Sequence, residues 1–545
     1  MSTGNVRPVA GQDAVEGSPL PSAEKGAPPE FTQALGHPSP LWMLFMSEFW
    51  ERFAFYGIRW ALVLYIVAQF HGGSNTGQAD ANLTYGSYLA LVYASAIFGG
   101  YVADKFIGYQ RSILTGAVIM AAGLFMISIP DPRIFKLGLA TIVVGNGMFK
   151  PIISTIVGRL YGPRDERRDS GFTIFYMGIN AGAFLAPLLT GWLANRVFGT
   201  PETPMYKAVF IASGVGMLIS LVWFYFGRTQ LKGIGAPPAA GMSMKRVGLV
   251  VVGALIAIPI FYALLAVGAK VLQSVLSVMF LALAITLLLE GIREGKEARD
   301  KTIAMLLIFA FNIMFWMFFE QAGSSFTFLA EQIVNRQLGG FTFPVAWFQS
   351  VNSLAIITLA PVVAYVWVAL ARKNMNPSIP RKFGLGLMFN GLAFLLLMFA
   401  LSSLVSAAGK IPFWTLVAVY VIQSVGELCL SPIGLSMVTK LAPARLVGFG
   451  MGGWFLSTGI GNNLSGIFAS VVSGEQGMTT ASALSGYTFG FYALMAAGLL
   501  LFFAAPLIAR LMHGVKKAGE ARPPASQLAT ASCRSTRAPP AREPT

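Results

Sequence analysis

Long apolar stretches dominate the chain from residue 41 to residue 511, and short polar segments separate them. Each stretch has about the 20 residues that a helix needs to cross the roughly 30 Å hydrocarbon layer of a bilayer. Helices satisfy their own backbone hydrogen bonds, which such a layer requires. The pattern predicts fourteen membrane-spanning helices, at residues 41–70, 85–103, 112–129, 137–160, 172–192, 208–226, 247–267, 271–290, 302–319, 343–370, 383–404, 413–441, 449–472 and 487–511.

The seventh and eighth stretches differ from the others because they hold no charge in their interior and follow a polar linker, residues 227–246. We interpret them as a peripheral hairpin. Without it, six helices precede and six follow, as expected when two bundles rock about a site at the middle of the membrane. The sequence therefore predicts five parts in chain order: a disordered tail at 1–40, a first bundle at 41–226, a connection with the hairpin at 227–301, a second bundle at 302–512 and a disordered basic tail at 513–545.

Composition agrees with a membrane protein, since 55% of the residues are hydrophobic and only 11% are charged. The net charge of +16 reflects Lys and Arg in loops, which orient membrane proteins, and we do not expect nucleic-acid binding. Lys and Arg concentrate in the loops on the side of the termini, which predicts cytosolic termini in a plasma membrane, by expectation a bacterial inner membrane. The two cysteines indicate neither a disulfide framework nor a metal site, and we expect no cofactor besides protons as the coupling ion.

Seven ionisable residues fall inside the predicted spans. They are Glu48, Glu51, Arg52, Arg59, Lys150, Glu320 and Glu427. Each costs roughly 2.5–3.5 kcal/mol or more in a bilayer, so the set is expected to converge on a wet interior that forms a transport pathway. Glu48 and Arg52 are four residues apart and share a helix face. A salt bridge that only supports packing is the alternative interpretation of that pair.

The intramembrane charges divide between the two bundles. All three cations lie in the first bundle, whereas Glu320 and Glu427 lie in the second. A zwitterion fits such a polarised cleft, and a short peptide offers an ammonium for Glu427 and a carboxylate for the cations on the other wall. Aromatic residues could line pockets for varied side chains; the candidates are Tyr56, Tyr93, Trp316 and Trp454.

Several motifs resemble known transporter signatures. Residues 100–111 (GYVADKFIGYQR) resemble the loop signature of the major facilitator superfamily. Residues 48–57 (EFWERFAFYG) resemble the opening motif of the proton-dependent oligopeptide transporter family. Further family-like blocks follow at 145–151 (GNGMFKP), 175–182 (FYMGINAG), 319–325 (FEQAGSS) and 426–432 (GELCLSP). The resemblance therefore extends over nearly the whole membrane region.

This resemblance implies an all-α polytopic protein with the major facilitator fold that imports di- and tripeptides together with protons. Carried over residue by residue, it implies proton coupling by Glu48, Glu51, Arg52, Lys150 and Glu320. It places the peptide amino group on Glu427 and the carboxylate on Arg52, Arg59 and Lys150. Contacts to the peptide backbone are implied for Tyr56, Tyr93, Asn180 and Asn352, and Ser431 completes the candidate substrate-binding residues together with Trp316, Glu320 and Trp454. We expect the protein to function as a monomer.

One position departs from the family pattern, because Phe55 stands where a second tyrosine is common. The acidic pair Glu48 and Glu51 favours peptide over nitrate, yet a proton symporter of another small solute, such as an amino acid or nitrate, remains the alternative. An embedded enzyme is a third hypothesis, but no nucleophile–base motif or metal cluster accompanies the acids. There is no phosphate-binding loop of the kind that ATP-driven pumps need.

Overall fold

The computed structural model describes residues 28–162, 165, 167–236 and 244–514. In this part of the chain, fourteen long helices correspond to the fourteen predicted spans, and α10 is a short additional helix. The helices are α1 (Pro40–Phe70), α2 (Gln78–Val102), α3 (Tyr109–Met126), α4 (Pro132–Arg159), α5 (Arg168–Trp192), α6 (Tyr206–Gly227), α7 (Met244–Ala266), α8 (Ala269–Glu294), α9 (Lys296–Phe319), α10 (Ser325–Gln332), α11 (Trp347–Arg372), α12 (Ile379–Ser403), α13 (Phe413–Leu441), α14 (Val447–Ser473) and α15 (Thr480–Leu511).

Twelve of the helical segments in the described residues are long and apolar enough to cross a membrane. The helices α3 and α14 are not among them. The helix α3 has only 18 residues and starts with Tyr109, Gln110 and Arg111, and α14 is rich in glycine and carries the adjacent Asn462 and Asn463. Both asparagines are fully buried, so they do not face lipid. Their polar side chains lower the mean hydropathy of α14 without exposing a polar surface to the membrane.

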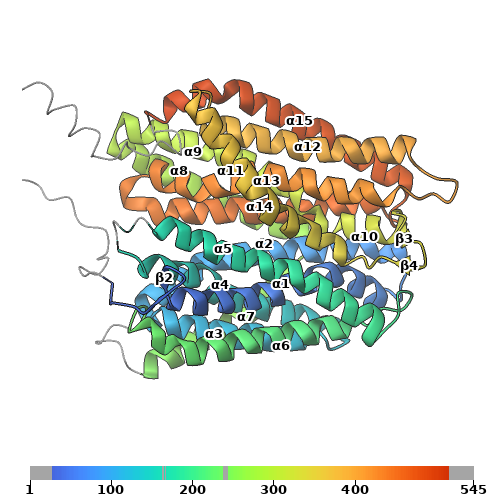
Figure 1. Ribbon diagram of the computed structural model, residues 1–545, viewed down its shortest axis with the longest axis horizontal. Coiled ribbons are helices and arrows are strands. Elements are labelled where there is room, and N and C mark those ends of the chain that lie inside the picture. Colours follow the sequence, from blue (N-terminus) through green and yellow to red (C-terminus); the bar gives the residue numbers. More distant parts are fainter. Residues whose placement is uncertain (1–27, 163–164, 166, 237–243, 515–545) are drawn as a thin grey trace, which may run out of the picture.

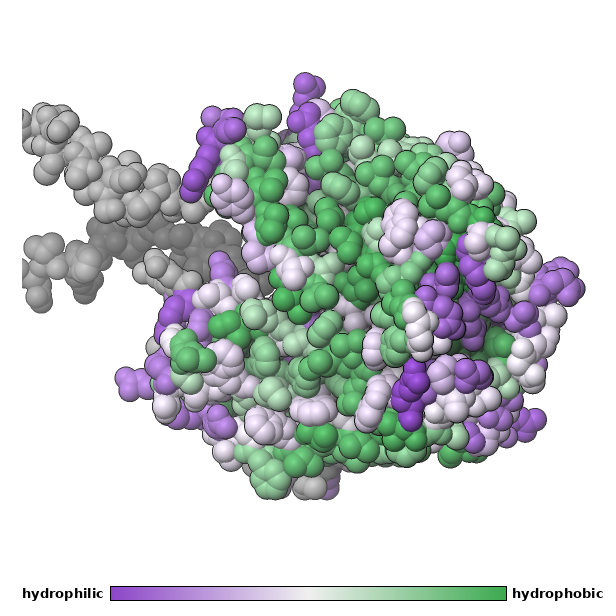
Figure 2. All heavy atoms as spheres, turned by 45° about the vertical axis from the view of Figure 1, so that its right-hand side comes forward, coloured by the Kyte–Doolittle hydropathy of each residue, from purple (hydrophilic) through white to green (hydrophobic). Residues whose placement is uncertain are grey.

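The helices form two groups that lie side by side (Figure 1). In one group, α1 packs against α5 and α6, and α3 packs against α4. In the other, α12 packs against α13 and α15, and α9 packs against α14. The two groups meet where α2 contacts α14 and where α5 contacts α11. Apolar side chains cover much of the face in Figure 2, and hydrophilic ones gather towards its left and right edges, as expected for a surface that lies in lipid.

The helices run between two opposite ends of the molecule, a tail face and a loop face. The tail face is the end where α1 begins and α15 ends, at the left of Figure 1. The loop face is the opposite end, which carries β3 (Gln337–Leu338) and β4 (Phe341–Thr342).

Glycines allow the closest helix contacts. A Cβ atom on Gly99 of α2 would lie 1.7 Å from the carbonyl oxygen of Gly147 in α4. Between the groups, a Cβ on Gly86 of α2 would lie 2.6 Å from the Cα of Gly466 in α14. Small residues at such points let helix backbones touch, which is the common device for packing helices in membranes.

Hydrogen bonds between the two groups lie towards the loop face in the described part of the chain. Asn82 of α2 donates to the carbonyl oxygen of Ala469 at 3.1 Å, and the Met478 amide donates to Gln78 Oε1 at 2.9 Å. Further bonds link Gln332 to Asn75, Trp347 to the Leu188 carbonyl and Ser350 to the Phe184 carbonyl. The groups are thus joined at the loop face.

Three features differ from the expectations from the sequence. The helices α2, α9 and α15 begin at Gln78, Lys296 and Thr480 rather than at 85, 302 and 487, because their more polar first turns are helical too. The helix α9 also ends in a 3₁₀ turn at Glu320–Gly323 before α10. The hairpin arms lie on different groups: α7 packs on α4, whereas α8 packs on α9 and α14. Only 11% of the apolar window of α7 and 17% of that of α8 are buried, so the hairpin is peripheral as predicted, but its arms touch both helix groups.

The third difference concerns the segment before α1, which is predicted to be disordered. Its described residues instead form a small antiparallel pair, β1 (Gln33–Ala34) with β2 (His37–Pro38). His37 Nδ1 lies 2.8 Å from the Tyr161 hydroxyl, and Arg167 donates to the Gly36 carbonyl. These contacts supply the order that a polar composition alone does not predict. Residues 1–27 and 515–545, the remaining parts of the predicted tails, lie outside the described residues.

Candidate functional site

The acidic pair of α1 surrounds Arg52. Glu48 Oε1 lies 3.2 Å from Arg52 Nε, and Glu51 forms a two-pronged ion pair with the same guanidinium, with 2.6 Å between Arg52 Nη2 and Glu51 Oε1. All three side chains are almost completely buried. Charges buried this deeply are tolerated only when paired and hydrogen-bonded. The second oxygen of Glu48 has no hydrogen-bond partner, so it is a place where a proton or a water could bind.

A second ion pair joins the two groups. Arg59 Nη2 of α1 lies 2.5 Å from Glu320 Oε2, and Arg59 Nε donates to the Tyr85 hydroxyl of α2 at 3.0 Å. Glu320 occupies the 3₁₀ turn that follows α9, so the break in that helix turns the carboxylate towards α1. This bridge links α1 of the first group to the turn after α9 in the second group.

Lys150 of α4 is placed differently from the two arginines. Its ammonium lies 4.4 Å from the centre of the Tyr93 ring, in a cation–π contact. Among the described residues it has no carboxylate within 4 Å, although the charges of Arg52, Glu51, Glu48 and Glu320 all act on it. The side chain is partly exposed. Lys150 is therefore a cation that can accept an incoming anion without first losing an ion pair.

Glu427 lies on the opposite wall, in α13. Asn352 of α11 donates to Glu427 Oε2 at 3.2 Å and to the Ser424 hydroxyl at 2.8 Å. No Lys or Arg of the described chain lies within 4 Å of the carboxylate, which is partly exposed. Tyr56 of α1 lies beside Arg59, whose guanidinium carbon is 5.8 Å from the centre of the Tyr56 ring.

The remaining candidate substrate-binding residues differ from one another in their surroundings. Asn180 uses its amide to donate to the Tyr176 carbonyl at 3.0 Å, within its own helix. Trp316 donates to Asn312 at 3.0 Å, and Trp454 is nearly buried against Phe309 and Phe383. The Ser431 hydroxyl is buried and has no hydrogen-bond partner. Trp454 therefore packs against aromatic rings of the second group, and its role as a substrate contact stays a prediction.

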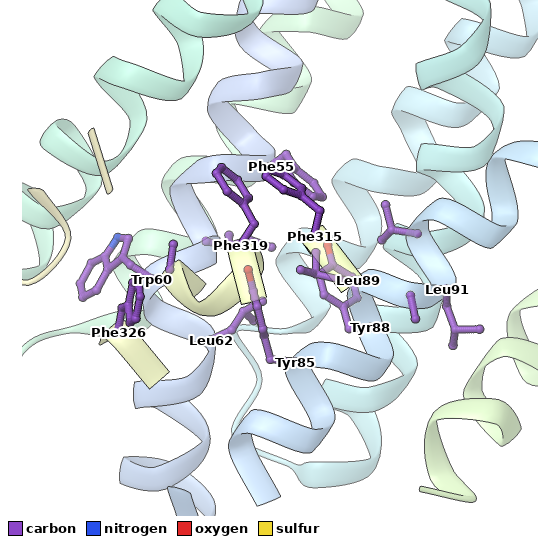
Figure 3. Packing of buried hydrophobic residues seen from close by; sticks show 14 of the residues in the cluster. Phe55, Trp60, Leu62, Tyr85, Tyr88, Leu89, Leu91, Phe315, Phe319 and Phe326 are labelled. Carbon is purple, nitrogen blue, oxygen red and sulfur yellow. The ribbon is translucent and has the colours of Figure 1, made fainter. Parts of the chain in front are cut away.

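Two further residues join the charged cluster. Asn146 of α4 donates to Glu51 Oε1 at 3.2 Å, and Tyr85 holds Arg59. Asn146 stands in the block at 145–151 and Tyr85 is a polar residue within a predicted span, so both carry a signal in the sequence, but their partners are far away along the chain. Figure 3 shows Tyr85, Tyr88 and Phe55 near Phe315 and Phe319, in one cluster of buried rings that packs around this part of the site.

Comparison with known proteins decides the family. A family model described as the POT family matches residues 110–484. The chain belongs to the POT family. It is therefore a multi-pass membrane transporter with the major facilitator fold and not an enzyme.

Individual POT relatives cover most of the chain. Peptide transporter YePEPT of Yersinia enterocolitica is 36% identical over 463 residues, which are 81% of this chain and 89% of that protein. Dipeptide and tripeptide permease B of Salmonella typhimurium is 32% identical over 455 residues, covering 82% and 90%. A crystal structure of peptide transporter POT in complex with sulfate has a TM-score of 0.75 at 34% identity, covering 89% of this chain and 98% of that one. A POT family transporter in complex with 5-aminolevulinic acid has a TM-score of 0.73 at 28% identity, covering 87% and 98%.

Proposed function

We propose that this protein imports di- and tripeptides together with protons by alternating access. The observation that carries the proposal is the pair of Lys150 and Glu427, two partly exposed, oppositely charged side chains from different helix groups, neither in an ion pair with another described residue. A peptide with free termini supplies the two missing partners. Curated relatives named as peptide transporters and as a dipeptide and tripeptide permease support this substrate class.

The roles of the arginines differ in this proposal. Lys150 takes the peptide carboxylate first, because Arg52 is held by Glu48 and Glu51 and Arg59 is held by Glu320. Arg52 and Arg59 strengthen that contact once a carboxylate partner is protonated. Glu427 takes the amino group, while Asn352, Tyr56 and Tyr93 contact the peptide backbone.

Proton coupling is proposed to act through the bridge between Arg59 and Glu320. A proton on Glu320 removes the negative charge that holds Arg59, so the loop face can open. The loss of a proton towards the other side restores the bridge and favours the closed loop face. Glu48 and Glu51 tune the same balance through Arg52 and through their charge on Lys150. The ligand drives the change only because it binds the states with different affinity.

The sidedness follows from the positive-inside rule. The loops at the tail face carry most of the Lys and Arg, so the tail face is proposed to be cytosolic and the loop face external. The closed loop face then makes this an inward-facing arrangement in a plasma membrane. We propose that a single chain is the working unit, since one chain contains both of the helix groups that alternating access needs.

A second candidate substrate is a small amino-acid-like zwitterion. It is favoured by the solved POT family structure in complex with 5-aminolevulinic acid, a molecule that also carries an ammonium and a carboxylate. Lys150 and Glu427 could hold its two ends in the same way.

Uptake of labelled dialanine into proteoliposomes, with and without an inward proton gradient, tests the proposal. We expect accumulation that needs the gradient and that unlabelled di- and tripeptides compete, while free alanine and nitrate do not. Competition by 5-aminolevulinic acid alone would support the second candidate. Absence of dialanine uptake by protein shown to be folded, by its unfolding transition in detergent, would refute peptide import.

A further inference from the structure

The two arms of the hairpin enclose an apolar cavity against the first helix group. The cavity has a volume of about 570 Å³ and is lined by α2, α4, α7 and α8, with Phe98, Met148, Gly253, Ala257, Phe261 and Leu276 among its walls. This volume lies within the range of about 300–1,000 Å³ that is typical of sites for small molecules. Almost all of its lining side chains are apolar, so water and peptide are poor occupants.

The cavity faces the membrane and not the transport site. Phe98 is 58% exposed and Leu249, at the start of α7, is 59% exposed, so the cavity opens to the bilayer. The charged residues of the site do not line it. An occupant therefore comes from the lipid phase.

Polar contacts close the cavity towards the loop face. Asn463 of α14 donates to the Ala269 carbonyl at 2.8 Å and to Gln273 Oε1 at 2.9 Å, and it accepts from the Ser87 hydroxyl of α2 at 3.1 Å. These hydrogen bonds hold the first residues of α8, at its loop-face end, against α14 and α2, where the two helix groups meet. The cavity therefore stays open laterally, towards the bilayer, and at its tail-face end.

Basic side chains stand at the tail-face end of the cavity. Here α7 packs against the π-helical turn Ala103–Ile107, and Lys105, Lys245 and Arg246 are exposed. The first turn of α7 has no acidic residue, and the neighbouring Asp104 accepts a hydrogen bond from Tyr109. Positive charge is therefore concentrated at the level where lipid headgroups lie.

We infer that the cavity holds one acyl chain of an anionic phospholipid, whose headgroup lies against Lys105 and Arg246. The inference goes beyond peptide transport and does not depend on it. The location gives the lipid a conformational role, because α7 packs on the first helix group and α8 on the second. When the groups rock, the width of the space between the arms changes, and a chain in that space favours the arrangement in which it fits.

Two glycines of α7 give a matched pair of variants. A Cβ on Gly253 or on Gly248 meets no atom within 4 Å, so a larger side chain is accommodated at either position. Only Gly253 lines the cavity. Gly253→Leu therefore fills it, whereas Gly248→Leu adds the same side chain to the same helix outside it. Ala257→Leu is a second filled variant should Gly253→Leu not fold.

The experiment uses the full-length protein in nanodiscs with phosphatidylglycerol that carries a photoreactive group in its acyl chain, and with phosphatidylcholine that carries the same chain. Cross-linked peptides are identified by mass spectrometry. We expect labelling of α2 and α7 around residues 91–102 and 249–264, stronger with phosphatidylglycerol. Gly253→Leu loses most of this labelling and Gly248→Leu keeps it. Arg246→Gln weakens the preference for phosphatidylglycerol by about fivefold, the effect of one basic residue near an anionic headgroup.

Equal labelling in the two leucine variants would overturn the inference, since the label would then report only lipid around the protein. Equal labelling by the two lipids would overturn the assignment of an anionic headgroup. Because the readout is cross-linking and not uptake, failure of this inference is distinct from failure of the proposed transport function.

Discussion

At the scale of single residues, Glu427 offers the sharpest test of the binding site, because one hydrogen bond from Asn352 is its only contact of that kind among the described residues. Glu427→Gln keeps the size of the side chain and removes the charge that is proposed to hold the peptide amino group. A hydrogen bond to a charged group contributes about 1.5–3 kcal/mol, so we expect the KM for dialanine to rise roughly tenfold or more. Initial uptake rates over a range of dialanine concentrations give the KM of the wild type and of the variant.

The control for Glu427→Gln changes the peptide instead of the protein. N-acetyl-dialanine lacks the ammonium, so the wild type and Glu427→Gln are expected to bind it equally weakly in competition against dialanine. An equal loss of affinity for the acetylated and the free peptide in the variant would place the effect elsewhere than at the amino group.

The acids of α1 should act on coupling and not on the exchange of peptide. Glu51→Gln can still accept from Asn146 and Arg52, yet it lacks the negative charge that balances Arg52. We expect Glu48→Gln and Glu51→Gln to abolish proton-driven accumulation while counterflow exchange of labelled for unlabelled peptide continues. Both assays are made on the same proteoliposomes. Normal accumulation in these variants would contradict the coupling role of the acids.

At the scale of helices, adjacent glycines of α2 separate packing from backbone effects. A Cβ on Gly99 would lie 1.7 Å from the Gly147 carbonyl oxygen, whereas a Cβ on Gly100 meets no atom within 4 Å. Overpacking costs typically about 1–3 kcal/mol, and for a chain of this length that corresponds to about 1–3 °C, so Gly99→Ala should lower the unfolding temperature in detergent by that amount. Gly100→Ala should leave it nearly unchanged. Equal shifts for the two variants would show that α2 and α4 do not touch as closely as described.

The helices also show which features of the fold the sequence predicts and which it does not. Hydropathy predicts the long helices because lipid-exposed segments such as α7 and α8 must be apolar. It does not predict that these two arms pack on different helix groups, since both present the same apolar character. It also does not predict the turn at Glu320–Gly323 or the short α10, where tertiary contacts and not hydropathy decide the backbone.

The functional site, like the helices, is predicted only in part by the sequence. The cost of intramembrane charge predicts that Arg59, Lys150 and Glu320 belong to one interior, but not which charges pair. Arg59 and Glu320 are 261 positions apart, and Lys150 rests on an aromatic ring instead of a carboxylate. Helical spacing predicts partners only within one helix, as for Glu48 and Arg52.

At the scale of the whole molecule, we propose that the bridge between Arg59 and Glu320 helps to hold the loop face shut, so its loss should open that face. Gln78 is fully buried at this seam and accepts from the Met478 amide. In a protein whose Cys429 and Cys533 are replaced by serine, Gln78→Cys reports opening by its reaction with a membrane-impermeant maleimide added from outside. We expect Glu320→Gln to increase that reaction rate severalfold.

Gln337→Cys, in the exposed strand β3, controls for reagent access and should react at the same rate with or without Glu320→Gln. Lowering the external pH slows maleimide reactions in general, because less of each thiol is thiolate, so the rate at Gln78→Cys is divided by the rate at the exposed Gln337→Cys. This ratio should rise as the external pH falls when Glu320 is present, because protonation removes the charge that holds Arg59. The same change of pH should have no such effect in Glu320→Gln, which already lacks that charge. A response to pH that persists in Glu320→Gln would assign the opening of the loop face to another proton site, with Glu48 and its unpartnered oxygen as the first to test.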